Sequence, residues 1–479
     1  MSGSLRLNLD PYLWCQILVL LVVGLVVLSH PVMPLYLTGL VAVSLMGLVG
    51  LLRCVVKPRE VSLWDLAVVS MCLGYGVGTL NTEINWIFML QDYLSVTDAR
   101  PESIARMLAW LMLLAAFLLA LGSMDSLKVF AIEWDDQAQG IGRVMVILVA
   151  IAAVVQVVTG AIGYHQDMTG DGVRVSPLAA ITVSAICPAL AIGIFCLPRA
   201  DAKTRQILLL SLIVLLLIQF YQGRRVFIYS VVLMLMCYSA TQSPRHWFSP
   251  KNLLLIVLAV AAMAMASKAF YALRMAKWEL GDSAKDVKLL IQTGAEILFD
   301  AKRSGLNEEL SENQKSRTFI IGYPAEILEA LDDREPLGGQ LLVFDVALTV
   351  PSVLWPNKYR VVSLGSEETI ANPQLGLRVS DEANSLISAG LSDFGVPGIF
   401  LYTAAIVLIF RFLIAFVRRF GSLPLLFCSA TFANALLNVE AAMADYFNVL
   451  RGLVILAIVV GLLMITWRSC APFFYRRTT

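Results

Sequence analysis

The chain has 479 residues, of which 58% are hydrophobic and only 15% are charged, and its formal net charge is +1. This composition and a mean hydropathy of +0.77 exclude a single soluble core and predict an all-α protein that crosses a membrane many times. The near-zero net charge produces no global field that would attract nucleic acid, so we expect no nucleic-acid partner.

Twelve apolar segments are predicted to cross the membrane, because a helix of about 20 apolar residues spans the hydrocarbon core. They are residues 11–29, 34–56, 62–80, 105–122, 142–162, 176–197, 206–222, 226–241, 253–270, 396–417, 423–438 and 449–467. The first follows Arg6 and Asp10 without a small-residue cleavage site, so we expect a retained span and no cleaved signal peptide. Residues 206–241 surround Arg224 and Arg225. They form either two spans or one broken helix, since they are too many for one straight crossing.

Lysine and arginine residues in the short loops predict that both termini are cytoplasmic. The loops on that side carry Arg53, Lys57, Arg59, Lys128, Arg199, Lys203, Arg205, Arg245, Lys251, Arg418, Arg419, Arg468, Arg476 and Arg477. The opposite short loops carry few, such as Arg100 and Arg174. Arg224 and Arg225 then lie at the outer surface. There they either snorkel to lipid headgroups or face an anionic ligand in a cavity open to the outside.

One large segment, residues 271–394, is predicted to lie outside the membrane on the outer side. It separates the first nine spans, in residues 1–270, from the last three spans and the tail, in residues 395–479. Apolar residues recur at helical spacing in KDVKLLIQTGAEILFD and in RTFIIGYPAEILEAL. We therefore expect amphipathic helices that lie on the outer leaflet and cap the bundle.

Charged residues are concentrated in this outer segment. They are Arg274, Lys277, Arg317, Lys358, Arg360, Arg378, Asp381, Glu382 and Asp393. Any one of them either belongs to a solvated face or lines a site. Arg317, Arg378 and Glu382 favour a site, because each lies directly beside apolar helical sequence.

Metal and nucleotide sites are not predicted. The eight cysteines include no CxxC pair and no Cys/His cluster with zinc spacing, and none lies in a segment predicted to be outside, so we expect no disulfides. Residues 167–172 lack the remaining ligands of an EF-hand loop, and no Gly-rich phosphate loop follows a strand. Glu440 and Asp445, in the last outer loop, either line the same cavity as the arginines or solvate helix ends.

Several short motifs follow one another between residues 220 and 410. After the arginine pair come Arg317 with Tyr323-Pro324, then Gly338-Gly339, then Pro351 through Trp355-Pro356-Asn357-Lys358, and finally Asn384 with Asp393-Phe394-Gly395 and Gly398. This order resembles the bacterial O-antigen and exopolysaccharide repeat-unit polymerases.

The resemblance implies a glycosyltransferase-C-like fold in the bacterial inner membrane. Such an enzyme moves a growing glycan from one undecaprenyl diphosphate carrier onto a new lipid-linked repeat unit at the outer face. It uses no metal, nucleotide sugar or other cofactor. Its partners are the lipid-linked glycans and the bilayer, with a chain-length-determining co-polymerase and a flippase as further candidates.

Three other functions stay open. A lipid-linked glycan ligase has the same layout, but that family usually carries a histidine in its large outer loop, and residues 271–394 contain none. A transporter or flippase for the lipid-linked unit often shows paired repeats with interrupted spans, and the Gly-Arg-Arg interruption has no second copy here. A purely structural scaffold is the third alternative.

The reaction that the resemblance implies would place specific demands on the predicted site. Negative charge grows on the departing diphosphate, and preorganised guanidinium groups stabilise that transition state. The predicted catalytic residues are Arg317, Arg378, Glu382 and Asp393, with the two carboxylates as candidate general bases and Glu440 behind them. The predicted diphosphate and glycan ligands are Arg224, Arg225, Arg274, Lys358, Arg360 and Asn384.

Overall fold

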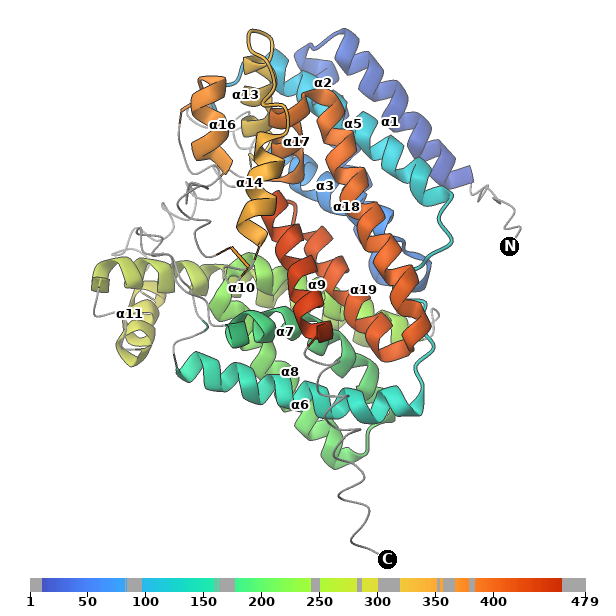
Figure 1. Cartoon of the computed structure of the whole chain (residues 1–479), viewed down its shortest axis with the longest axis vertical. Coiled ribbons are helices and arrows are strands. Elements are labelled where there is room, and N and C mark those ends of the chain that lie inside the picture. Colours follow the sequence, from blue (N-terminus) through green and yellow to red (C-terminus); the bar gives the residue numbers. More distant parts are fainter. Residues whose placement is uncertain are drawn as a thin grey trace, which may run out of the picture.

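The computed structural model describes residues 11–81, 83, 97–159, 162, 177–242, 250–281, 287–299, 319–350, 354–355, 367–378 and 384–458. Within these residues every regular element is a helix, as Figure 1 shows, which confirms the all-α prediction.

Seven helices are long and apolar enough to cross a membrane, in agreement with a multi-pass membrane protein. They are α2 (Met33–Val56), α3 (Leu63–Met71) with its continuation η2 (Cys72–Gly78), α5 (Pro101–Ser123), α6 (Asp136–Val158), α7 (Pro177–Cys196), α8 (Ala202–Gln222) and α18 (Val396–Val417). Shorter apolar helices occupy three more predicted spans, namely α1 (Pro11–Ser29), α9 (Arg224–Thr241) and α19 (Ser422–Leu437). Residues 443–458 are helical where the twelfth span is predicted to begin.

The helix α10 differs most from its prediction. It runs from Pro250 to Leu280 and thus continues well past residue 270, where the ninth span was expected to end. The reason lies in the sequence ASKAFYALRMAKWEL, which consists largely of good helix formers and ends at Gly281, in a left-handed conformation at φ 51°. Its 31 residues extend about 46 Å, more than the hydrocarbon core needs.

Polar residues at the helix starts explain several boundaries. Ser62 and Asp65 form a reciprocal capping box at the start of α3. The Asp135 side chain accepts a hydrogen bond from the Ala138 amide at the start of α6, and Asp201 does the same for α8 from Thr204. These caps satisfy amide groups that have no partner inside the helix.

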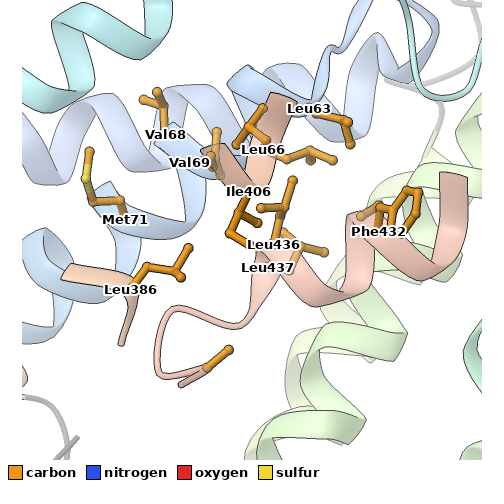
Figure 2. Close-up of a cluster of buried hydrophobic side chains, with 14 of the residues drawn as sticks. Leu63, Leu66, Val68, Val69, Met71, Leu386, Ile406, Phe432, Leu436 and Leu437 are labelled. Carbon is orange, nitrogen blue, oxygen red and sulfur yellow. The ribbon is translucent and has the colours of Figure 1, made fainter. Parts of the chain in front are cut away.

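The core is built around α3, whose residues are almost all buried. Figure 2 shows its side chains Leu66 and Val69 beside Ile406 of α18 and Leu436 and Leu437 of α19. The helix that follows Ser385 contributes Leu386 to the same cluster. Segments far apart in the sequence therefore share one apolar core.

Arginines at the predicted cytoplasmic ends bind backbone carbonyl groups close to the ends of other helices. Arg59 Nε donates to the Ala240 carbonyl at 2.9 Å, at the end of α9. Arg199 donates to the Trp134 carbonyl at 2.8 Å, and Arg143 donates to the Arg199 carbonyl at 2.6 Å. These contacts give Arg59, Arg143 and Arg199 a structural role that does not depend on the orientation of the chain in a membrane.

Four short helices of the outer segment gather at one end of the bundle (Figure 1). They are α13 (Gly322–Ala330), α14 (Gln340–Thr349), α16 (Glu367–Leu375) and α17 (Leu386–Phe394). We call them the cap helices. The cap helices are not all amphipathic surface helices as expected, because every residue of α17 from Leu386 to Asp393 is buried. The expected pattern fits α11 (Val287–Phe299), which packs on the end of α10 and leaves Ile291 and Phe299 exposed.

Candidate functional site

The structure describes only part of the predicted site. Arg317, Lys358, Arg360 and Glu382 lie outside the described residues. Of Arg224 and Arg225 the structure gives the backbone, which forms the first two residues of α9. Arg274, Arg378, Asn384 and Asp393 are described in full, and they do not come together at one place.

Asp393 is completely buried, and both of its carboxylate oxygens accept hydrogen bonds. Its two carboxylate oxygens accept hydrogen bonds from the amides of Leu341 at 3.0 Å and Leu342 at 2.9 Å, in the first turn of α14. The Tyr402 hydroxyl donates a further bond to the same carboxylate. Since Gly339 caps α14 in a left-handed conformation without a side chain to offer, Asp393 supplies the missing acceptor from a distant part of the chain.

Arg378 lies on the surface of the cap helices. Its side chain is 86% exposed, and its guanidinium forms an ion pair of 3.6 Å with Asp98, whose side chain is 64% exposed. Its backbone carbonyl accepts a hydrogen bond from Asn372 Nδ2 at 2.6 Å. The side chain is therefore available to a ligand, while the backbone belongs to the cap.

Arg274 lies in the continuing part of α10, above two aromatic rings. Its guanidinium carbon is 4.6 Å from the centre of the Trp278 ring and 5.9 Å from that of Tyr271. One turn earlier, the Phe270 ring contacts Phe220 in the last turn of α8. Residues one helical turn apart share a face, so Arg274 lies on the side of α10 that faces the α8–α9 break.

The break between α8 and α9 occurs at Gly223, which is extended and serves as the cap residue of both helices. Phe220 and Phe227 pack against each other across it at 5.7 Å. Residues 206–241 thus form two helices separated at Gly223, of which α8 is long and apolar enough to cross a membrane and α9 is a shorter apolar helix. The arginine pair begins α9, where no acidic residue stands in the first turn.

The centre of the candidate site is the π-helical segment η2, whose wide turns place Tyr75 next to the start of α17. The Tyr75 hydroxyl and the Ser385 hydroxyl are 2.7 Å apart, and both residues are buried. A Cβ on Gly74 would lie 2.5 Å from Val439, so this glycine allows the turn after α19 to approach η2 closely. Isolated π-helical turns occur frequently at functional sites.

The turn after α19 brings two carboxylates to the same place. Glu440 interacts electrostatically with Tyr75, and Asp445 accepts a hydrogen bond from the Ala442 amide at 3.1 Å. Tyr446 interacts with Asp445, with Tyr75 and with Tyr229 of α9. We call Tyr75, Tyr229, Ser385, Glu440, Asp445 and Tyr446 the outer junction.

Asp445 lies between α19 and the predicted last span. Its side chain reaches solvent, but surrounding protein removes much of its hydration, which raises its pKa; the Ala442 amide partly offsets this effect. A carboxyl group with a raised pKa is a better proton acceptor near neutral pH.

Asn384 is the one fully described residue of the predicted site that belongs to this place in the fold, because it precedes Ser385 directly. Its side-chain oxygen is buried and has no hydrogen-bond partner among the described residues. Those residues also contain no group of three acidic, histidine or cysteine side chains that could hold a metal ion.

Sequence reasoning missed the pair of Tyr75 and Ser385. The available signal was CLGYGVG, three glycines at alternate positions inside an apolar span, which is unusual for a helix that only crosses a membrane. Comparisons of the chain with protein-family models, with curated proteins and with solved structures found no match.

Proposed function

We propose that the protein joins undecaprenyl-diphosphate-linked repeat units into a surface polysaccharide at the outer face of the bacterial inner membrane. In this proposal the chain has twelve spans, both termini are cytoplasmic, and the bundle is glycosyltransferase-C-like. The observation that carries the proposal is the outer junction. There Glu440 and Asp445 lie within electrostatic range of Tyr75 and Tyr446, respectively, and Tyr446 lies within that range of Tyr229 in the helix that begins with Arg224 and Arg225.

The start of α9 suits a diphosphate. Tyr229, which interacts with Tyr446, lies five residues after Arg224, or about 8 Å along the helix axis. The N-terminal end of a helix carries positive partial charge, and two arginines in its first turn add to that charge. An anion bound there would be stabilised both by the helix end and by guanidinium groups.

The carboxylates provide the other half of the reaction. In the proposed step, a hydroxyl of the incoming repeat unit attacks the anomeric carbon of the growing glycan. The new oxygen–carbon bond forms, the bond from that carbon to the diphosphate oxygen breaks, and the hydroxyl proton passes to a carboxylate. We assign Asp445 as the carboxylate that accepts this proton, and Glu440 is the neighbouring carboxylate.

A transporter is less well supported than a transferase. A charge inside a span would favour transport, and Arg411 of α18 lies within a predicted span. This charge is paired, because its Nε is 2.9 Å from the Asp125 carboxylate. The Trp64 indole and the Leu127 amide also donate to Asp125, so the pair ties three segments together.

Deletion of the gene in its host tests the proposal. Undecaprenyl-diphosphate-linked glycans would be profiled by mass spectrometry, with the outer leaflet separated from the inner. A polymerase predicts that single repeat units accumulate on the outer face. Long lipid-linked polymer there would identify a ligase instead, single units retained inside would identify a flippase, and an unchanged pool would refute the proposal.

A further inference from the structure

Three asparagine side chains present buried oxygen atoms that accept no hydrogen bond from any residue the structure describes. They are Oδ1 of Asn384, of Asn434 and of Asn438. Most buried polar atoms in folded proteins have a partner, and leaving one without a donor costs free energy. These three oxygens therefore need a donor that the described residues do not supply.

The two segments that carry the three asparagines both contact η2. Asn434 lies in the last turn of α19 and Asn438 follows the helix four residues later, so both face the same side. Val439, next to Asn438, contacts Gly74. Ser385, next to Asn384, is bonded to Tyr75. Because Gly74 and Tyr75 are adjacent, the two segments that carry the asparagines approach each other at η2.

Another buried asparagine shows how the protein treats such a side chain when its role is structural. Asn372 is completely buried, its Oδ1 accepts from the Tyr323 hydroxyl at 2.8 Å, and its Nδ2 donates to the Arg378 carbonyl at 2.6 Å. Both ends of the amide are satisfied. Asn384, Asn434 and Asn438 differ from Asn372, because their side-chain oxygens accept no hydrogen bond from a described residue.

The chemistry of the oxygens selects the ligand class. A carboxamide oxygen accepts hydrogen bonds, so its partner must be a donor, which excludes an ionised diphosphate. A polyhydroxyl compound offers several donors at once, and its hydroxyls accept in return from the asparagine NH2 groups and from Tyr75 or Ser385. Glu440 and Asp445, on the same turn, would accept further hydroxyl protons.

We propose that Asn384, Asn434 and Asn438 form a subsite for a neutral sugar unit. The statement that this sugar is the acceptor, with its attacking hydroxyl directed to the carboxylates of the outer junction, rests on the function proposed above. The sugar subsite itself does not rest on that function, because it is inferred from the three buried oxygens.

Stability measurements on the purified full-length protein in detergent provide the first test. Asn434→Leu and Asn438→Leu remove an unsatisfied oxygen and keep the side-chain volume, so we expect Tm to rise by about 1–3 °C. The matched control Asn372→Leu removes a satisfied amide and should lower Tm. If Asn434→Leu and Asn438→Leu lower Tm as Asn372→Leu does, the oxygens are structural and the subsite is refuted.

Binding is tested with the same proteins and a panel of glucose, galactose, rhamnose and N-acetylglucosamine, each at roughly 100 mM. A ligand that binds only the folded state raises Tm. We expect at least one sugar to raise the Tm of the wild type and to leave that of Asn438→Leu unchanged. No rise with any sugar, or an equal rise in the variant through solvent exclusion, overturns the proposal. A rise with CaCl2 or NaCl alone, lost in the variant, identifies a cation site and overturns it as well.

The two proposals fail separately. If a sugar binds through Asn438 but gene deletion leaves the lipid-linked glycans unchanged, the subsite stands and the polymerase falls. If single repeat units accumulate on deletion but no sugar raises Tm, the polymerase stands and the subsite falls.

Discussion

Asp393 shows how one side chain can unite two motifs that are about 50 residues apart in the sequence. Its carboxylate holds the first turn of α14, and its backbone carbonyl accepts the Gly338 amide at 2.9 Å. The pair Gly338-Gly339 is left-handed at both positions, so the chain can turn there and present its amides to the carboxylate. The contacts that Asp393 makes are those of an architectural residue.

This geometry predicts that Asp393→Asn loses stability as well as activity. The new NH2 group would face one of the two donating amides, Leu341 or Leu342, and the Tyr402 bond would lose its charged acceptor. We expect the free energy of unfolding to fall by about 2–3 kcal/mol, measured by denaturant unfolding in detergent. Asp333→Asn, at an exposed position nearby, is the control and should change little. Lost polymer with an unchanged unfolding free energy would instead support the predicted catalytic role of Asp393.

At the scale of elements, α17 and α18 approach each other as closely as two backbones can. A Cβ on Gly398 would overlap the Gly390 carbonyl oxygen. A Cβ on Gly390 would lie 2.5 Å from the Gly398 carbonyl oxygen. The helices are joined through Gly395 alone, at φ 64°. Small residues let helices in membranes pack in this way.

Gly398→Ala is therefore expected to disrupt the packing of the buried helix α17. The amount of folded protein recovered from membranes should drop several-fold, as judged by monodispersity on size-exclusion chromatography. The control is Gly140→Ala in α6, where an added Cβ would meet nothing within 4 Å and alanine favours the helix by about 1 kcal/mol. Equal recovery of the two variants would contradict the close contact.

The cap helices dock on the bundle through carboxylates of α13 and the turn after it. Glu326 accepts from Thr97 and from the Asp98 amide, and Glu329 accepts from the amide and side chain of Arg100 at the start of α5. Asp332 forms two hydrogen bonds with Arg106, which lies further along α5. Carboxylates are favourable at a helix N-terminus, so these acidic side chains of another segment stabilise the N-terminal end of α5.

Acid should weaken this docking. The hydrogen bonds from Arg106 lower the pKa of Asp332 below its ordinary value of 3.8, so the carboxylate contributes stability fully above that value. The contribution is lost as pH falls through the lowered pKa. Because the pair is partly exposed, it is worth roughly 0.5 kcal/mol. The Tm difference between wild type and Asp332→Asn should shrink when pH is lowered from about 6 to about 3. A constant difference across this range would contradict the ion pair.

Local sequence signals predicted most helices and missed those that depend on tertiary contacts. Caps such as Ser62 and Asp135 and the length of the apolar runs mark the spans, because both act within one segment. The burial of α17 was not predictable from its short polar-flanked sequence, since it depends on Gly390 and Gly398 meeting. The π-helical turns of η2 likewise depend on close packing against the turn after α19.

At the scale of the whole molecule, the fold divides the ends of the helices between two ends of the bundle. The starts of α5 and α18 and the end of α19 meet the cap helices or the outer junction. The ends of α5 and α9 carry the Asp125–Arg411 pair and the Arg59 contact on the other side. Because the helices alternate in direction, the outer junction lies at one end of the bundle, and the contacts of Arg59 and Arg411 lie at the other end.

Arg378 is the described arginine that best separates binding from folding. Its side chain is 86% exposed and its only described ion pair is with the exposed Asp98, so Arg378→Ala should leave Tm within about 1 °C of the wild type. If it binds the lipid-linked glycan or diphosphate, a deletion strain complemented with Arg378→Ala should still make the protein but form polymer at a rate reduced roughly 100-fold. Arg334→Ala, on the same cap and donating to the Gln374 carbonyl, is the matched control and should support normal chain length. Normal polymer from both variants would remove Arg378 from the site and leave the outer junction as the place where the glycan is bound.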